Sequence, residues 1–127
     1  MRKKAREIAF KSIYQNLFID LSQDELGQIF EDEKLEEDDD KFVFEIISNF
    51  KQNREELTKK IEENLKGYEI SRVYKIDLAL LYLALVEVDY IKTPNSVVIN
   101  EVVELAKTYS TEKSPKFLNG VLSTLIG

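Results

Sequence analysis

Apolar residues recur along most of the chain at steps of three and four, which is the spacing of one face of an α-helix. Residues 5–21 show the pattern first, and Phe10, Tyr14 and Phe18 form a second apolar line beside the main one. The main line is Ala5, Ile8, Ala9, Ile13, Leu17 and Leu21. We therefore predict a long helix here with a broad apolar side. Its basic residues lie at the amino end, where they oppose the helix dipole, which indicates a purpose other than helix stability.

An acidic segment follows the first helix. Ser22 and Glu25 have the spacing of a capping box, in which a hydroxyl and a carboxylate each satisfy an unpaired amide at a helix start. Leu26, Ile29 and Phe30 then give a short second helix one apolar face. Residues 31–40 are mostly carboxylates. We expect them to form a solvated connector, or a frayed helix, that ends in an Asp cap of the next helix.

The middle of the chain predicts two further helices. The third presents one apolar face, made by Val43, Ile46, Ile47 and Phe50. Asn53 and Glu56 can form another capping box, which would open the fourth helix. The fourth is lined by Leu57, Ile61 and Leu65. Gly67 is well placed as its left-handed stop.

The last part of the chain is the most hydrophobic. Residues 76–88 are apolar on nearly every side, which is typical of a helix surrounded by other helices. Residues 92–95 then predict a turn, and residues 98–109 carry the spacing of a sixth helix. Ser114 and Pro115 predict the cap and the first position of a seventh. Together these patterns predict an all-α fold of about seven helices.

The composition excludes most catalytic chemistry. Cysteine, histidine and tryptophan are absent, so the chain offers no thiol nucleophile, no imidazole base and no thiolate or imidazole metal ligand. Carboxylates could still act as acids or bind magnesium, but no acidic cluster stands among glycines or in a pattern that would line a cleft. We therefore expect neither an enzyme nor a cofactor.

Charge is distributed unevenly along the chain. Residues 1–11 hold five bases and one acid, a net charge of +4, whereas residues 20–40 hold eleven acids and one base, a net charge of −10. A basic arm on an acidic body can bind a polyanion locally while the acidic segment discourages indiscriminate binding. Glu7 and Lys11 interrupt the apolar run that a secretion signal would need, and the longest apolar run, residues 78–86, is too short for a membrane span. We expect a cytoplasmic protein.

Two stretches together resemble the NusB family. The first is Arg2-Lys3-Lys4-Ala5-Arg6-Glu7-Ile8-Ala9 followed by Tyr14, which is similar to the arginine-rich first helix of that family. The second comprises Asp77, then Leu83-Ala84-Leu85-Val86-Glu87, then Val97-Val98-Ile99-Asn100-Glu101-Val102-Val103-Glu104-Leu105-Ala106-Lys107, then Lys116-Phe117-Leu118-Asn119-Gly120-Val121-Leu122. The first stretch is weakly specific, because any basic amphipathic helix could match it. The second is strongly specific.

The resemblance implies one domain over residues 1–127, with two packed three-helix lobes at about residues 1–66 and 67–127. It also implies a function in transcription antitermination. Members of the family pair with NusE, a ribosomal protein of the small subunit, and the pair binds the boxA element of single-stranded nascent RNA. The resulting RNA polymerase antitermination complex promotes transcription of ribosomal RNA operons.

Single-stranded RNA is held by cations that follow its phosphates and by aromatic rings on which unpaired bases stack. The candidate cations of the first helix are Arg2, Lys3, Lys4, Arg6 and Lys11. Tyr14 and, through the resemblance, Phe117 are candidate stacking residues, with core packing as the alternative for each. Lys113 and Lys116 extend this surface if the seventh helix packs beside the first, and are otherwise ordinary surface lysines. The alternative for the basic arm is a solubilising, disordered start.

For contact with NusE, the resemblance points to Asp77, Tyr82 and Glu87. Asp77 has an equally plain alternative as a first-turn acid that complements the helix dipole. Asn100 and Glu101 match the family closely, yet they could equally tie the sixth helix to its neighbours.

Two further points leave the functional interpretation open. Lys113 stands where relatives often carry an acid or an asparagine, so this extra cation should strengthen non-specific RNA binding. The competing interpretation is a helical protein-interaction scaffold or homodimer without direct RNA contact, because some members of the family form homodimers.

Overall fold

The computed structural model describes residues 2–29 and 34–127, and all regular structure in these residues is helical. The α-helices are α1 (Arg2–Phe18), α2 (Gln23–Ile29), α3 (Glu37–Glu63), α4 (Lys75–Val86), α5 (Asn95–Tyr109) and α6 (Ser114–Leu125). A 3₁₀ turn, η1 (Ile70–Arg72), precedes α4, and a π-helical turn, η2 (Glu87–Ile91), follows it. The predicted all-α fold is confirmed, with six α-helices in the described residues where about seven were expected.

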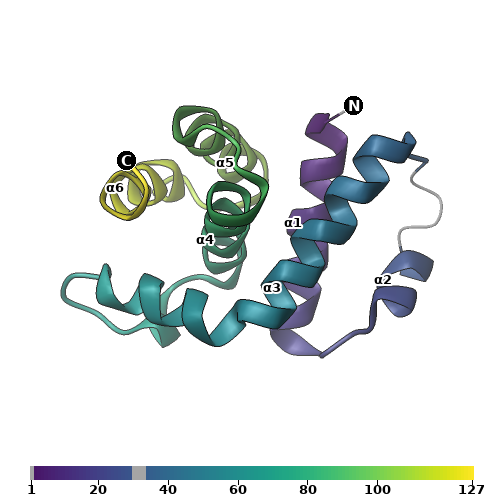
Figure 1. Cartoon of the computed structure of the whole chain (residues 1–127). Helices are drawn as coiled ribbons and strands as arrows, with labels where there is room; N and C mark the ends of the chain where they lie inside the picture. Colours follow the sequence, from purple (N-terminus) through teal and green to yellow (C-terminus); the bar gives the residue numbers. More distant parts are fainter. Residues whose placement is uncertain (1, 30–33) are drawn as a thin grey trace.

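Helix α4 is the centre of the molecule. In Figure 1 the first part of α3 lies alongside α1, and α4 stands between this pair and the pair α5 and α6. Every residue from Leu78 to Val86 is buried, so α4 contacts other helices on all sides, as its uniformly apolar sequence predicted. Burial of each large apolar side chain contributes about 1.5–3 kcal/mol before conformational entropy is subtracted, so α4 organises a core shared by α1, α3, α5 and α6.

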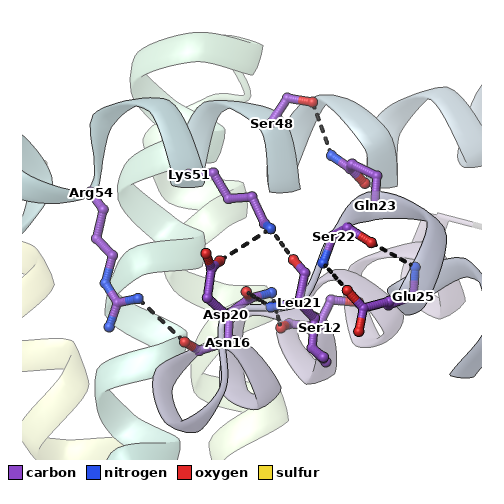
Figure 2. Close-up of polar contacts among 10 residues, drawn as sticks. All are labelled: Ser12, Asn16, Asp20, Leu21, Ser22, Gln23, Glu25, Ser48, Lys51 and Arg54. Carbon is purple, nitrogen blue, oxygen red and sulfur yellow. Dashed lines mark hydrogen bonds and ion pairs between the residues drawn. The ribbon is translucent and has the colours of Figure 1, made fainter.

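The corner between α1, α2 and α3 is held by polar contacts (Figure 2). Arg54 and Lys51 of α3 donate to the backbone carbonyls of Asn16 and Leu21, which satisfies acceptors where α1 ends. The predicted capping box of α2 is confirmed, because the Glu25 amide donates to Ser22 Oγ at 3.1 Å and the Ser22 amide donates to Glu25 Oε1 at 3.1 Å. Short-range sequence chemistry therefore determines where α2 begins.

Replacement of Ser22 with alanine should lower the free energy of unfolding by about 1 kcal/mol, because one amide of α2 loses its acceptor. Urea denaturation followed by circular dichroism would measure the loss. Ser123→Ala is the matched control, since the exposed Ser123 hydroxyl only bonds back to the Asn119 carbonyl within α6 and its removal should be close to neutral. Equal stability of the two variants would contradict a stabilising role for the capping box.

The amino end of α3 corrects one prediction. Residues 34–36 form no regular structure, but α3 begins at Glu37, ahead of the expected Asp cap, with Glu36 at its N-cap position. Four acids, residues 37–40, occupy the first turn, where carboxylates interact favourably with the unpaired amides and the positive end of the helix dipole. The part of the expected connector at residues 31–33 lies outside the described residues.

The expected third and fourth helices are one helix with a bend. Asn53 has φ −118° and ψ 16°, and its side-chain amide donates to the Asn49 carbonyl at 2.9 Å instead of capping a new helix. Such bonding to the preceding turn bends a helix without ending it. Gly67 does adopt a left-handed conformation, with φ +90°, although α3 has already ended at Glu63.

The remaining elements follow the sequence pattern closely. The turn before α5 passes through Lys92, whose φ of 67° is left-handed, and Pro115 stands in the first turn of α6, as expected. Lys113 occupies the N-cap position and Ser114 begins the helix, one position earlier than predicted. None of the helices in the described ranges is long and apolar enough to cross a membrane.

Candidate nucleic-acid interface

Three cations at the amino end of α1 are exposed, and two of them have acidic neighbours. Arg2 Nε lies 3.3 Å from Asp39 Oδ1 of α3, and its guanidinium stands 4.1 Å from the centre of the Phe42 ring. Lys4 Nζ lies 3.9 Å from Glu7 Oε1, and Lys3 is exposed on the same turn. The Lys4–Glu7 pair is accessible to solvent and therefore weak, so a phosphate can replace its carboxylate at little cost. The Asp39 side chain is only 10% exposed, so Arg2 is held more firmly against α3.

Lys11 lies about two turns beyond Lys4 along α1, beside an aromatic ring of α5. Its Nζ is 3.1 Å from Glu7 Oε1 and 5.3 Å from the centre of the Tyr109 ring. Partial burial alone would raise the pKa of Glu7, but its contacts with Lys11 and Tyr109 outweigh this and lower it. The same contacts raise the pKa of Lys11 despite its partial burial. Both groups are therefore charged at neutral pH, and Lys11 remains a cation on the α1 surface.

Arg6 does not belong to this exposed set. Its side chain is 6% exposed, and its Nε and Nη2 donate to the two carboxylate oxygens of Glu87 at 2.7 and 2.9 Å. Burial alone would lower the pKa of Arg6, but the hydrogen bonds and charge of Glu87, with a further contribution from Glu101, raise it. The hydrogen-bonding groups of this pair satisfy each other inside the protein. Because both side chains are buried, neither the predicted contact of Arg6 with RNA nor that of Glu87 with a partner is favoured by this structure.

Asp77 and Tyr82 are also inside the protein, with exposures of 2% and 3%. Asp77 accepts hydrogen bonds from Ser110 Oγ at 2.6 Å and Ser114 Oγ at 2.9 Å, which ties the start of α4 to the start of α6. The Tyr82 hydroxyl bonds to Thr58 Oγ1 at 2.6 Å. The residues predicted to face NusE thus have hydrogen-bond partners within the fold. Asp77 does stand in the first turn of α4, as its alternative supposed, but its bonds to Ser110 and Ser114 are a role that neither interpretation included.

Tyr14 lines a surface hollow of about 340 Å³, which we call the α1 hollow. Its lining comprises Tyr14, Tyr74, Lys75, Ile76, Tyr109, Ser110 and Thr111. Tyr14 is half-buried and packs edge-on against Phe18, with 5.1 Å between ring centres. One side of Tyr14 therefore packs within α1 while another borders the hollow.

Phe117 lines a second hollow of about 510 Å³, which we call the α6 hollow. It is bounded by Tyr68, Arg72, Val73, Tyr74, Asp77, Thr111, Lys113, Ser114 and Phe117. The rings of Tyr68 and Phe117 are 6.0 Å apart between centres. Lys113 is exposed at the edge of this hollow, and Lys116 lines a neighbouring depression together with Phe117. The predicted residues of the seventh helix, now α6, thus gather around one aromatic surface.

The two hollows share Tyr74 and Thr111 in their linings, so the aromatic surface of α1 continues to the start of α6. The sequence patterns did not single out five side chains of this surface, because these fall between helical patterns or belong to a helix predicted for the core: Tyr68, Arg72, Tyr74, Lys75 and Tyr109. A usable signal was present in Arg72-Val73-Tyr74-Lys75, where an aromatic residue stands between two bases just before a buried helix.

Chemically, this arrangement suits binding. Among the residues that the structure describes, no group of three or more acidic side chains is placed to hold a metal ion. The surface carries cations on α1, and Arg72, Lys75 and Lys113 add further cations around the two hollows. Tyrosine and phenylalanine rings line the same hollows. Cations with interleaved aromatic rings are the combination that holds single-stranded nucleic acid.

Comparisons with known proteins agree on one family. The NusB family model matches residues 3–126. The transcription antitermination protein NusB of Clostridium novyi is 36% identical, with 98% of this chain and 97% of that protein covered.

The structure of T. maritima NusB matches with a TM-score of 0.87 and 31% identity over 98% of this chain and 89% of that one. A crystal structure of NusB and NusE in complex with double-stranded RNA matches with a TM-score of 0.87 and 28% identity, over 98% of this chain and 94% of that one. Because the family model and these alignments extend over nearly its whole length, this chain belongs to the NusB family.

Proposed function

We propose that this protein is a cytoplasmic, RNA-binding transcription antitermination factor that pairs with NusE and binds boxA-type single-stranded RNA. The observation that carries the proposal is that Lys11 of α1 stands over the ring of Tyr109, which lines the α1 hollow, and that this hollow shares Tyr74 and Thr111 with the α6 hollow. Relatives named for transcription antitermination and a similar NusB structure solved with NusE and RNA support it. Transcription of ribosomal RNA operons is the setting that follows from boxA recognition.

Within this proposal, the RNA contacts on α1 come from Arg2, Lys3, Lys4 and Lys11, with Tyr14 beside them. Lys113, Lys116 and Phe117 continue the surface on α6. Arg6 is left out, because its guanidinium is already bonded to Glu87 in the interior. Tyr82 and Glu87 are left out of the proposed contact with NusE because both are buried. Asp77 lines the α6 hollow but is 2% exposed and already bonded to Ser110 and Ser114, so it is left out as well.

A titration of labelled boxA-like RNA with and without NusE would test the proposal. We expect NusE to raise the affinity for the boxA-like RNA but not for a scrambled RNA of the same composition, because phosphate contacts alone carry no sequence information. Fluorescence polarisation at a fixed salt concentration would measure both affinities. The absence of binding to either RNA, with NusE present, would refute the proposal.

The competing interpretation, a scaffold or homodimer that does not touch RNA, gives a different result in the same samples. Sedimentation at several protein concentrations would then reveal a stable dimer. RNA would leave its sedimentation unchanged.

A further inference from the structure

The most exposed tyrosine of the site, Tyr74, lies between its two hollows. Tyr74 is 66% exposed. This is unusual, because the large aromatic ring of a tyrosine is normally at least partly buried in a folded protein. It precedes α4 directly, and it lines both the α1 hollow and the α6 hollow. A ring in this position presents apolar surface to a ligand on either side.

The charges around the two hollows favour a particular orientation of that ligand. Arg72, Lys75 and Lys113 are exposed at the edges, whereas the carboxylate of Asp77 is buried beneath the α6 hollow. Burial of Tyr68, together with the negative charge of Asp77, raises the pKa of the Tyr68 hydroxyl. The interior of this hollow is therefore unfavourable for an anion, while its edge is favourable.

A nucleotide in a single strand satisfies both conditions, since its base is a neutral aromatic plane and its phosphate is an anion. The volumes of about 340 and 510 Å³ fall within the range of roughly 300–1,000 Å³ that is usual for small organic ligands. Bases in the hollows would contact tyrosine and phenylalanine rings, and the phosphates would remain with the cations at the edges.

We infer that Tyr74 is a stacking residue for RNA, and that neighbouring unpaired bases occupy the α1 hollow and the α6 hollow on its two sides. The inference rests on the proposed function and deepens it, because it identifies where the bases bind as distinct from the phosphates. It makes the route across the surface specific: the strand runs from the cations of α1, over Tyr74, to Lys113 at the start of α6.

Substitutions at Tyr74 separate stacking from charge. Tyr74→Ala should weaken binding of a boxA-like single strand about tenfold, because base stacking on an aromatic ring is lost. Its salt dependence should stay unchanged, since no phosphate contact is removed. Tyr74→Phe should retain full affinity, because stacking does not require the hydroxyl. Tyr90→Ala is the matched control, since Tyr90 is exposed on η2 and lines neither hollow.

A spectroscopic signal reports the contact directly. The chain contains no tryptophan, so Tyr74→Trp introduces a single tryptophan, which can be excited selectively over the tyrosines. Its emission should be quenched by the boxA-like strand but not by an abasic strand of the same length, which carries the phosphates alone. Tyr90→Trp should respond to neither strand.

Each other outcome overturns the inference in a distinguishable way. If the wild-type protein binds RNA and Tyr74→Ala binds equally well, Tyr74 is not a stacking residue and the proposed function survives. If NusE alone quenches Tyr74→Trp, the surface belongs to the protein partner. If the wild-type protein binds no RNA even with NusE, the proposed function fails together with the inference.

Discussion

Reversing the charge of the α1 cations that lie outside the core is expected to abolish binding of single-stranded RNA. The substitutions are Arg2→Glu, Lys3→Glu, Lys4→Glu and Lys11→Glu. If these side chains neutralise about four phosphates, log affinity of the wild-type protein should fall with log salt at a slope of about −3. A fourfold rise in salt would then weaken binding about fiftyfold. In the variant, the residual affinity should be too low to measure under the same conditions.

The matched control reverses four exposed lysines that line neither hollow, so that net charge changes equally: Lys41, Lys59, Lys92 and Lys107. This control should retain most of the affinity, because it leaves the local field of α1 in place. Circular dichroism and thermal melting would check that both variants are folded. Full RNA binding by the folded α1 variant would show that α1 is not the phosphate-binding element.

Arg6→Ala is expected to have the largest effect on stability of any single substitution considered. It leaves the carboxylate of Glu87, which is fully buried, without the guanidinium that holds both its oxygens. Removing one partner of a buried ion pair costs about 3–5 kcal/mol. Because domains of this kind are stable by only about 5–15 kcal/mol, the variant should melt at a much lower temperature or fail to fold.

A double variant keeps this prediction testable if Arg6→Ala does not fold. Arg6→Met combined with Glu87→Met replaces the pair with apolar side chains, which is often close to neutral for stability. Comparison of its free energy of unfolding with those of Arg6→Met and Glu87→Met alone measures the coupling between the two residues. The double variant should also bind RNA with the salt dependence of the wild-type protein, because Arg6 contacts no phosphate. A reduced salt slope would instead return Arg6 to the RNA-binding set.

This ion pair also connects distant parts of the chain. Arg6 belongs to α1, whereas Glu87 begins η2 and additionally accepts a hydrogen bond from Thr93 Oγ1 at 3.1 Å. Lys60 of α3 reaches the same turn through an ion pair of 2.8 Å with Asp89. Two helices of the first half of the chain are thus held to the turn that leads into α5, which carries Tyr109 to its place beside Lys11.

Local sequence predicted most helices because their causes are local. The capping box at Ser22, the first-turn proline at Pro115 and the left-handed Gly67 depend on residues a few positions apart, and each has the expected conformation. Where several local signals competed, the outcome was less predictable. Asn53 could cap a new helix or bond back to the preceding turn, and the backbone continued as one bent helix.

The candidate site was predicted less completely than the fold. Four of the five α1 cations lie outside the core, but Arg6 does not, although all five belong to one basic segment. Helical spacing places Arg6 near the buried line of Ala5 and Ala9, yet a charged side chain was expected to face water. Glu87 compensates the buried charge of Arg6, but it lies far along the chain, so the pairing became apparent only in the folded structure.

By itself, the sequence determined the helical class, the central buried helix, the basic amino end and the family resemblance, because periodicity, capping and charge act over short distances along the chain. The tertiary structure decided which charges reach solvent and which aromatic rings meet. Burial depends on the neighbouring helices that cover a side chain, so Arg6 found a buried partner in Glu87, and Tyr74 remained exposed between two hollows built by helices α1, α4, α5 and α6.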